Sequence, residues 1–206
     1  MDTIEELVQR YPKTAALQDK IRAAADMIID CYRNDGTVYT VGNGGSAADA
    51  SHIVGEFMKA FVKPRPVPQL DVEAFSRLED GDYLASRLQS GFRAISLMTQ
   101  EGITTAVQND QGWDMAPAQQ LYSLARKGDV LIGISTSGNA RNVHLACQVA
   151  KVKGVGIIGL AGKSGGLLAK DSDIPIVVPE NETYMIQELH LPIYHAICIA
   201  VEEAFF

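Results

Sequence analysis

Three stretches of this 206-residue chain repeat one order: a short apolar run, a loop rich in glycine or hydroxyl residues, and a helix-forming segment. The apolar runs lie at 37–41, 130–134 and 155–160, and a fourth at 174–178 precedes a closing helix over 184–206. Apolar runs without alternation, separated by helices, are typical of parallel strands covered on both faces. We therefore predict a doubly wound α/β fold, with a parallel sheet between two layers of helices.

Helices are also expected ahead of the sheet and after its loops. Apolar residues recur at helical spacing from 14 to 31, after a shorter helix over 4–10. Further helices are predicted to follow the first two loops, at 47–61 and 140–153. The first two helices form an N-terminal extension over 1–35.

One segment, 63–88, does not fit the alternation of strand and helix. It begins with Pro64, Pro66 and Pro68, which break regular structure, and the rest of it is mostly polar and charged. A chain of this length is expected to form one domain. We therefore predict a single domain over 1–206, with an insertion at 63–88 that leaves the sheet.

The composition is that of a globular protein that needs no disulfides. Hydrophobic residues make up 47% of the chain and charged residues 21%, which excludes disorder as the main state. Cys31, Cys147 and Cys198 are odd in number and far apart, so neither a disulfide framework nor a cysteine metal site is expected. The chain shows neither a leader pattern nor a stretch of about 18 apolar residues. We expect a soluble cytoplasmic protein without a membrane partner.

The charge balance bears on the possible partners. Asp and Glu number 25 against 18 Lys and Arg, which gives a formal net charge of -7. Binding to a nucleic-acid backbone requires clustered basic residues, so no nucleic-acid partner is expected. A local pocket for one phosphate group is compatible with this balance.

Two of the loops suit ligand binding, because ligands of open parallel sheets bind beyond the carboxyl ends of the strands. The first, Gly42–Ser46, lets backbone N–H groups approach a ligand closely, although a simple tight turn explains it equally well. The second, Ser135-Thr136-Ser137-Gly138, offers three hydroxyls at a predicted helix start. Helix capping does not require all three, so we favour a phosphate-binding loop over a cap.

A third group of candidates lies on two of the predicted helices. His52 and Glu56 are four residues apart and share one face of the helix after the glycine loop. Gln187 and His195 share one face of the closing helix. Together the four side chains could bind a divalent metal such as zinc. Against this, a His–Glu pair is more often a surface hydrogen bond, and glutamine is a poor zinc ligand.

Three motifs resemble those of a known family. They are VGNGGSAADASHIVGEF at 41–57, GDVLIGISTSGNARNV at 128–143 and YMIQELHLPIYH at 184–195. In this order they are similar to the sugar isomerase (SIS) fold family, and within it to the phosphoheptose isomerases. The resemblance covers nearly the whole chain except 63–88. It implies a flavodoxin-like or Rossmann-like three-layer sandwich, and a homotetramer with active sites at the subunit interfaces.

The resemblance also implies an activity and the residues that perform it. The implied reaction converts a phosphorylated sugar, sedoheptulose 7-phosphate, to D-glycero-D-manno-heptose 7-phosphate, with one zinc ion per subunit. Glu56 is implied as the general base and His195 as the general acid. The zinc ligands implied by motif are His52, Glu56, Gln187 and His195. The implied substrate contacts are Asn43, Gly44, Gly45, Ser46, Glu56, Asn109, Asp110, Ser135, Thr136, Ser137 and Gln187.

The chemistry explains why these residue types are needed. Moving a carbonyl between C2 and C1 removes a carbon-bound proton and returns one to the neighbouring carbon, through an enediol. A carboxylate can carry that proton and an imidazole can serve the oxygens. A metal or hydrogen-bond donors can stabilise the enediolate.

Two departures from the motifs bear on the sugar specificity. Ala140 stands where the isomerases commonly place a serine, and Tyr184 stands where an acidic residue often precedes the IQE motif. Two alternatives therefore stay open: a non-catalytic SIS protein of the replication-initiator-associating type, and an isomerase or sensor for another sugar phosphate. The complete set of four implied zinc ligands favours catalysis, since a scaffold has no reason to place all four.

Overall fold

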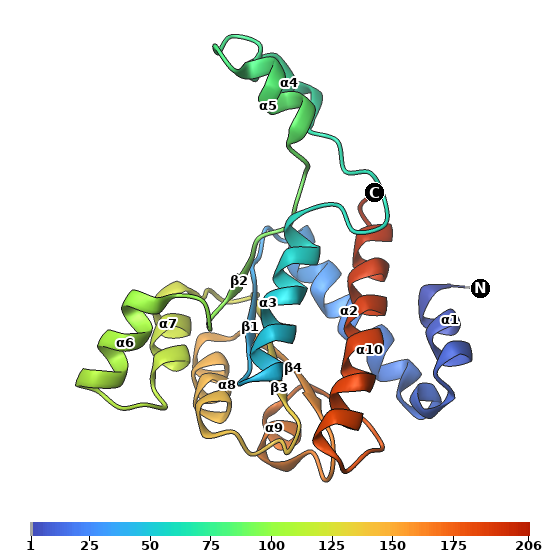
Figure 1. Ribbon diagram of the computed structural model, residues 1–206, viewed down its shortest axis with the longest axis vertical. Helices are drawn as coiled ribbons and strands as arrows, with labels where there is room; N and C mark the ends of the chain where they lie inside the picture. The colour runs from blue at the N-terminus through green and yellow to red at the C-terminus, as the bar shows by residue number, and fades with distance from the viewer. Residues whose placement is uncertain (1) are drawn as a thin grey trace.

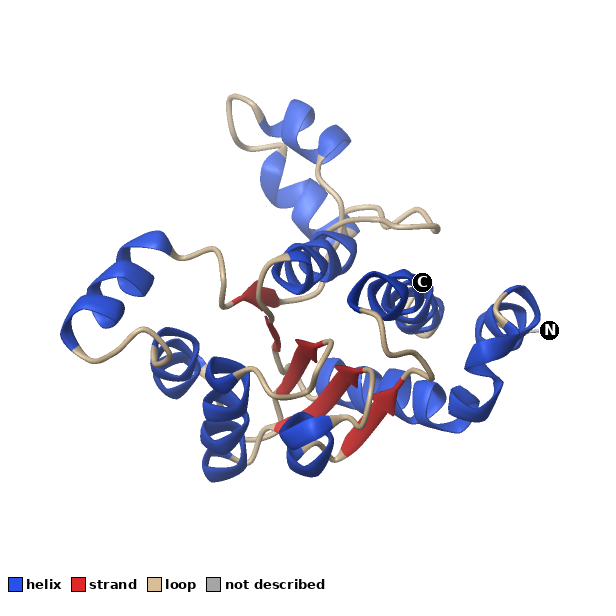
Figure 2. Cartoon of the chain, turned by 60° about the horizontal axis from the view of Figure 1, so that its bottom comes forward, coloured by secondary structure: helices blue, strands red, loops and turns tan. Residues whose placement is uncertain are grey.

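The computed structural model describes residues 2–206 as a parallel sheet between two layers of helices (Figures 1 and 2). The five strands lie in the order β2-β1-β3-β4-β5, and every neighbouring pair is parallel. This confirms the predicted doubly wound α/β fold. The strands are β1 (Val38–Val41), β2 (Ala94–Ser96), β3 (Val130–Ser135), β4 (Gly156–Ala161) and β5 (Ile174–Val177).

The helices largely follow the predicted ranges. The helix expected over 14–31 begins as a separate 3₁₀ helix, η1, and continues as α2. Three elements between 94 and 124 (β2, α6 and α7) were not predicted. No helix within residues 2–206 is both long enough and apolar enough to span a membrane. The helices are α1 (Thr3–Arg10), η1 (Pro12–Leu17), α2 (Gln18–Arg33), α3 (Gly45–Met58), α4 (Gln69–Phe75), α5 (Gly81–Arg87), α6 (Glu101–Asp110), α7 (Ala116–Leu124), α8 (Arg141–Lys153), α9 (Gly166–Asp171) and α10 (Thr183–Glu203).

The apolar run of β3 supplies a core on each face of the sheet. Successive side chains of a strand point to opposite faces. Val130, Ile132 and Ile134 accordingly pack with residues of α2, α3 and α10, whereas Leu131 packs with residues of α8. A strand buried on both sides must be apolar at every position, which is why the run shows no alternation.

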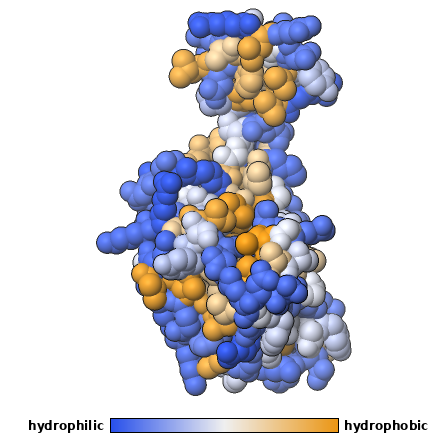
Figure 3. All heavy atoms as spheres, turned by 90° about the vertical axis from the view of Figure 1, so that its left-hand side faces the viewer, coloured by the Kyte–Doolittle hydropathy of each residue, from blue (hydrophilic) through white to orange (hydrophobic). Residues whose placement is uncertain are grey.

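The chain between α3 and β2 leaves the sheet as an arm, residues 66–89. Its helices α4 and α5 pack on each other and stand away from the body (Figure 1). Apolar side chains lie on its surface (Figure 3), and Leu70 is 77% exposed. The arm nearly coincides with the segment 63–88 that was expected to be an insertion; the domain boundaries themselves stay a prediction.

A buried carboxylate anchors the root of the arm. Glu202, near the end of α10, accepts hydrogen bonds from the backbone N–H groups of Phe61, Val62 and Lys63 at 2.8–2.9 Å. Its Oε1 also lies 2.7 Å from Nε of Arg65, and both side chains are fully buried. The turn that follows α3 is therefore wrapped around one side chain of α10.

Candidate active site

The loops after β1 and β3 meet at the carboxyl edge of the sheet. After β1 the chain forms β2 on one side of that strand and then β3 on its other side, so the strand order reverses between β1 and β3. Ligands of open α/β sheets bind at such a point. Asn43, in the loop after β1, exchanges two side-chain hydrogen bonds with Asn142 in the first turn of α8, at 2.8 and 2.9 Å. The two loops predicted to bind a ligand are thus held side by side.

The glycine loop, Gly42–Ser46, also approaches α10. A Cβ atom on Gly45 would lie 2.4 Å from Nε2 of Gln187, so a side chain at this position would displace the amide. Ser46 is buried, and its N–H donates to the carbonyl of Asn43 at 3.0 Å. Glycine at position 45 therefore lets the loop lie directly beside the Gln187 amide.

The serine loop, Ser135–Gly138, leads from β3 toward α8. Its first residue is buried and the next two are partly buried. Gly138 has φ of +70°, and a Cβ atom there would collide with the carbonyl of Gly165. The three hydroxyls of this loop lie just before the N-terminus of α8, a 13-residue helix. The helix dipole favours an anion at this place.

The predicted base and acid lie close together between α3 and α10. Nε2 of His52 is 2.9 Å from Oε1 of Glu56, and the ring centroids of His52 and His195 are 5.0 Å apart. Glu56 is only 9% exposed, and Nζ of Lys59 lies 3.5 Å from its Oε2. A carboxylate and two imidazoles thus share one partly buried site.

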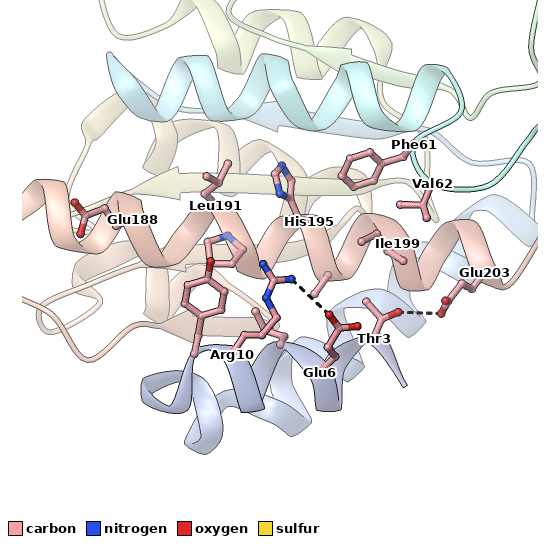
Figure 4. A pocket seen from close by; sticks show the side chains of 14 residues that line it. Thr3, Glu6, Arg10, Phe61, Val62, Glu188, Leu191, His195, Ile199 and Glu203 are labelled. Carbon is pink, nitrogen blue, oxygen red and sulfur yellow. Dashed lines mark hydrogen bonds and ion pairs between the residues drawn. The ribbon is translucent and has the colours of Figure 1, made fainter. Parts of the chain in front are cut away.

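His195 has a ring nitrogen available for chemistry. Its Nε2 is buried and has no hydrogen-bond partner within residues 2–206. Burial, assisted by His52, lowers the pKa of His195 below its usual value, although Glu56 opposes this shift. The ring packs against Phe61 and lines a cavity of about 350 Å³ between α1 and α10, where Arg10 lies on the opposite wall (Figure 4).

The predicted zinc ligands fit that metal in chemical kind. Two of them, His52 and Glu56, face each other at 2.9 Å, and the unpartnered Nε2 of His195 is a free donor nearby. Within residues 2–206, however, no group of three or more His, Cys, Asp or Glu side chains is arranged to hold a metal ion. Gln187 lies eight residues before His195, about 12 Å along the helix axis, and its amide lies beside the glycine loop. Three of the four, His52, Glu56 and His195, are therefore donors of the right type, and one chain does not gather all four into a closed cluster.

Four other residues named in the sequence analysis lie apart from these four donors. Asn109 and Asp110 are exposed at the end of α6, where Nδ2 of Asn109 donates to Oδ1 of Asp110 at 2.8 Å. Figure 1 places α6 at the outer side of the molecule. Ala140 occupies the N-cap position of α8 without a side-chain cap, and Tyr184 is exposed near the start of α10. One chain alone does not bring Asn109 and Asp110 to the other predicted substrate contacts.

Four polar partners of the site were not among the sequence-predicted residues. They are Asn142, Lys59, Tyr194 and Asp49. Each of them lies close in sequence to a predicted site residue, which could have identified it. Asn142 follows the serine loop and Lys59 follows Glu56. Tyr194 directly precedes His195, and Asp49 precedes His52 by one helical turn.

Comparisons with known proteins extend over most of the chain. SIS domain models match residues 1–77 and 113–200. A phosphoheptose isomerase of Aneurinibacillus thermoaerophilus is 39% identical over 199 residues, which cover 94% of this chain and 88% of that protein. The chain belongs to the phosphoheptose isomerase family of SIS-domain proteins. Another member, from Geobacter sp. (strain M21), is 38% identical over 191 residues, which cover 92% of this chain and 86% of that protein.

Solved structures of the family share the fold. The phosphoheptose isomerase of Neisseria gonorrhoeae matches with a TM-score of 0.76 and 32% identity, covering 97% of this chain and 94% of that one. The enzyme of Francisella tularensis matches with a TM-score of 0.78, 28% identity and the same coverage. The SIS fold expected from the three motifs is confirmed.

Proposed function

We propose that this chain is an aldose–ketose isomerase that converts sedoheptulose 7-phosphate to D-glycero-D-manno-heptose 7-phosphate. The observation that carries the proposal is the placement of Glu56 and His195 beside the same side chain, His52, in a member of the phosphoheptose isomerase family. A poorly solvated carboxylate and an imidazole supply the base and the acid that an enediol isomerisation needs.

Glu56 is the group that moves the carbon-bound proton. Starting from the ketose, its carboxylate takes a proton from C1 while His195 supplies a proton to O2, which gives the enediol. Glu56 then returns its proton to C2 and His195 takes the proton from O1, which gives the aldose. The low exposure of Glu56 limits competition from water for its carboxylate.

The serine loop is proposed to hold the phosphate. Its three hydroxyls and the positive end of α8 suit a phosphate monoester without a large basic patch. Asn43 and the glycine loop, tied to α8 through Asn142, lie where they can contact the sugar hydroxyls. Binding of the remote phosphate then orients the reacting end of the sugar.

We also propose that His52, Glu56, Gln187 and His195 hold a zinc ion. When bound, the ion would stabilise negative charge on the enediolate oxygens. The chemical kind of the donors and the free Nε2 of His195 support this assignment.

The distances along α3 support a homotetramer with shared active sites. Ser46 and Glu56 are ten residues apart, about 15 Å along the helix axis, so the glycine loop and the proton-transfer residues lie toward different ends of α3. A neighbouring subunit that brings its own loops to Glu56 would complete the site. The cytoplasm is the proposed compartment, in keeping with three free, buried cysteines.

A substrate panel tests this proposal. Zinc-replete protein is incubated separately with sedoheptulose 7-phosphate, a ketohexose phosphate and an amino-sugar phosphate, and the products are followed by NMR. We expect the heptulose phosphate to give the highest kcat/KM. A preference for the amino sugar would overturn the heptose assignment, and no turnover of any of the three would overturn the isomerase.

A further inference from the structure

A hydrogen-bonded chain runs through the site from one carboxylate to another. Asp49, His52 and Glu56 occupy positions i, i+3 and i+7 of α3, so they form a stripe on one face of that helix. Tyr194, from α10, joins the first two: its hydroxyl donates to Oδ1 of Asp49 at 3.2 Å and lies 3.0 Å from Nδ1 of His52. Nε2 of His52 then faces Oε1 of Glu56 at 2.9 Å.

The partners in this chain decide which ring nitrogen of His52 faces the site. Nδ1 lies 3.0 Å from the Tyr194 hydroxyl, which also donates to Asp49. With Nδ1 engaged on the side of Tyr194, Nε2 is the nitrogen presented to Glu56.

Packing alone does not hold the His52 ring in this position. The His52 side chain is 42% exposed, which leaves the ring room to turn, whereas Tyr194 is 2% exposed and fixed. Nor does the burial of a tyrosine by itself require such partners. Tyr32, in α2, also has a buried hydroxyl, and that hydroxyl has no hydrogen-bond partner within residues 2–206.

We propose that Tyr194, backed by Asp49, is a positioning residue that fixes the ring orientation of His52 toward Glu56. The inference rests on the proposed function, because it assigns Tyr194 and Asp49 to the support of the same site. Groups that hydrogen-bond the far nitrogen of a functional histidine commonly set its orientation and its metal affinity.

The engagement of Nδ1 can be observed directly, without turnover. The chain has four histidines, so a long-range ¹H–¹⁵N correlation spectrum of metal-free, ¹⁵N-labelled protein resolves their ring nitrogens. We expect the ¹⁵N chemical shift of His52 Nδ1 to change in Tyr194→Phe, which removes its partner, and to stay unchanged in Tyr32→Phe. Asp49→Ala tests the same chain from its other end and is expected to change the same shift, because it frees the Tyr194 hydroxyl.

Zinc affinity and kinetics give the functional readout, with Tyr32→Phe as the matched control. Both variants remove one buried hydroxyl, but only Tyr194→Phe touches the site. Tyr194→Phe is expected to lower zinc affinity and kcat by about 10- to 100-fold, with KM little changed. Tyr32→Phe is expected to leave zinc affinity, kcat and KM unchanged.

The inference and the proposed function can fail separately. An unchanged ¹⁵N chemical shift of His52 Nδ1 in Tyr194→Phe, or zinc affinity and kcat in that variant equal to those of Tyr32→Phe, would overturn the positioning role. Absence of turnover in the unmodified protein would overturn the proposed function, while the NMR result would still decide the orientation of His52.

Discussion

At the scale of single residues, turnover depends most on Glu56. Glu56→Gln keeps the shape of the side chain and removes the base, so we expect kcat to fall by about 10²- to 10⁴-fold. The unfolding temperature should change little. Glu188→Gln, an exposed change on α10, is the matched control and should keep normal activity. Near-normal kcat in Glu56→Gln, measured on sedoheptulose 7-phosphate, would remove Glu56 as the base.

Single residues also show how far the spacing of residues along the sequence predicts their contacts. The i,i+4 pair of His52 and Glu56 could be predicted from the sequence and makes the expected contact. Gln187 and His195 do share a helix, but eight residues separate them by about 12 Å along its axis, so a shared face does not bring their side chains to one point. The bond of Tyr194 to Asp49 joins positions 145 residues apart, which no local pattern encodes.

At the scale of elements, the junction of α3, α10 and the arm depends on Glu202. Glu202→Gln leaves Arg65 buried without its counter-ion, so we expect the free energy of unfolding to fall by about 3–5 kcal/mol. Urea denaturation measures this loss. Glu203→Gln, its exposed neighbour, should change it little. Equal stability of the two variants would show that the buried pair does not hold the junction.

The same carboxylate makes stability depend on pH. Burial alone would raise the pKa of Glu202, but hydrogen bonds from the backbone of 61–63 and from Arg65 hold the pKa below its usual value of 4.5. A carboxylate with a lowered pKa stabilises the fold above the pKa of the unfolded state, and this contribution is lost as pH falls through the folded value. The free energy of unfolding should therefore fall more steeply below about pH 4.5 in the unmodified protein than in Glu202→Gln. Parallel curves would contradict this.

The predicted and unpredicted elements differ for physical reasons. The long apolar runs of β3 and β4 are buried on both faces, so their sequence carries a strong signal. By contrast, β2 has three residues, too few to show any period. The link between the glycine and serine loops, Asn43 to Asn142, spans 99 positions and exists only once the sheet has formed.

At the scale of the whole molecule, the arm is separable from the body. Its two helices pack on each other and stand clear of the sheet, so replacing 67–88 with a short glycine-rich linker should leave the body folded. Circular dichroism and thermal unfolding measure this, with the full chain as the reference. A large drop in the unfolding temperature would show instead that the exposed apolar side chains of the arm are covered in the assembled protein.

Isomerisation of a heptulose phosphate by Glu56 has one direct test. Sedoheptulose 7-phosphate is incubated in deuterated water with the zinc-replete protein, and separately with Glu56→Gln, and followed by ¹H NMR. We expect an aldose from the unmodified protein and far slower formation by Glu56→Gln, because Glu56 carries the transferred proton. Deuterium at C2 would show that this proton exchanges with solvent before its return. No aldose from the folded, unmodified protein would contradict the isomerisation.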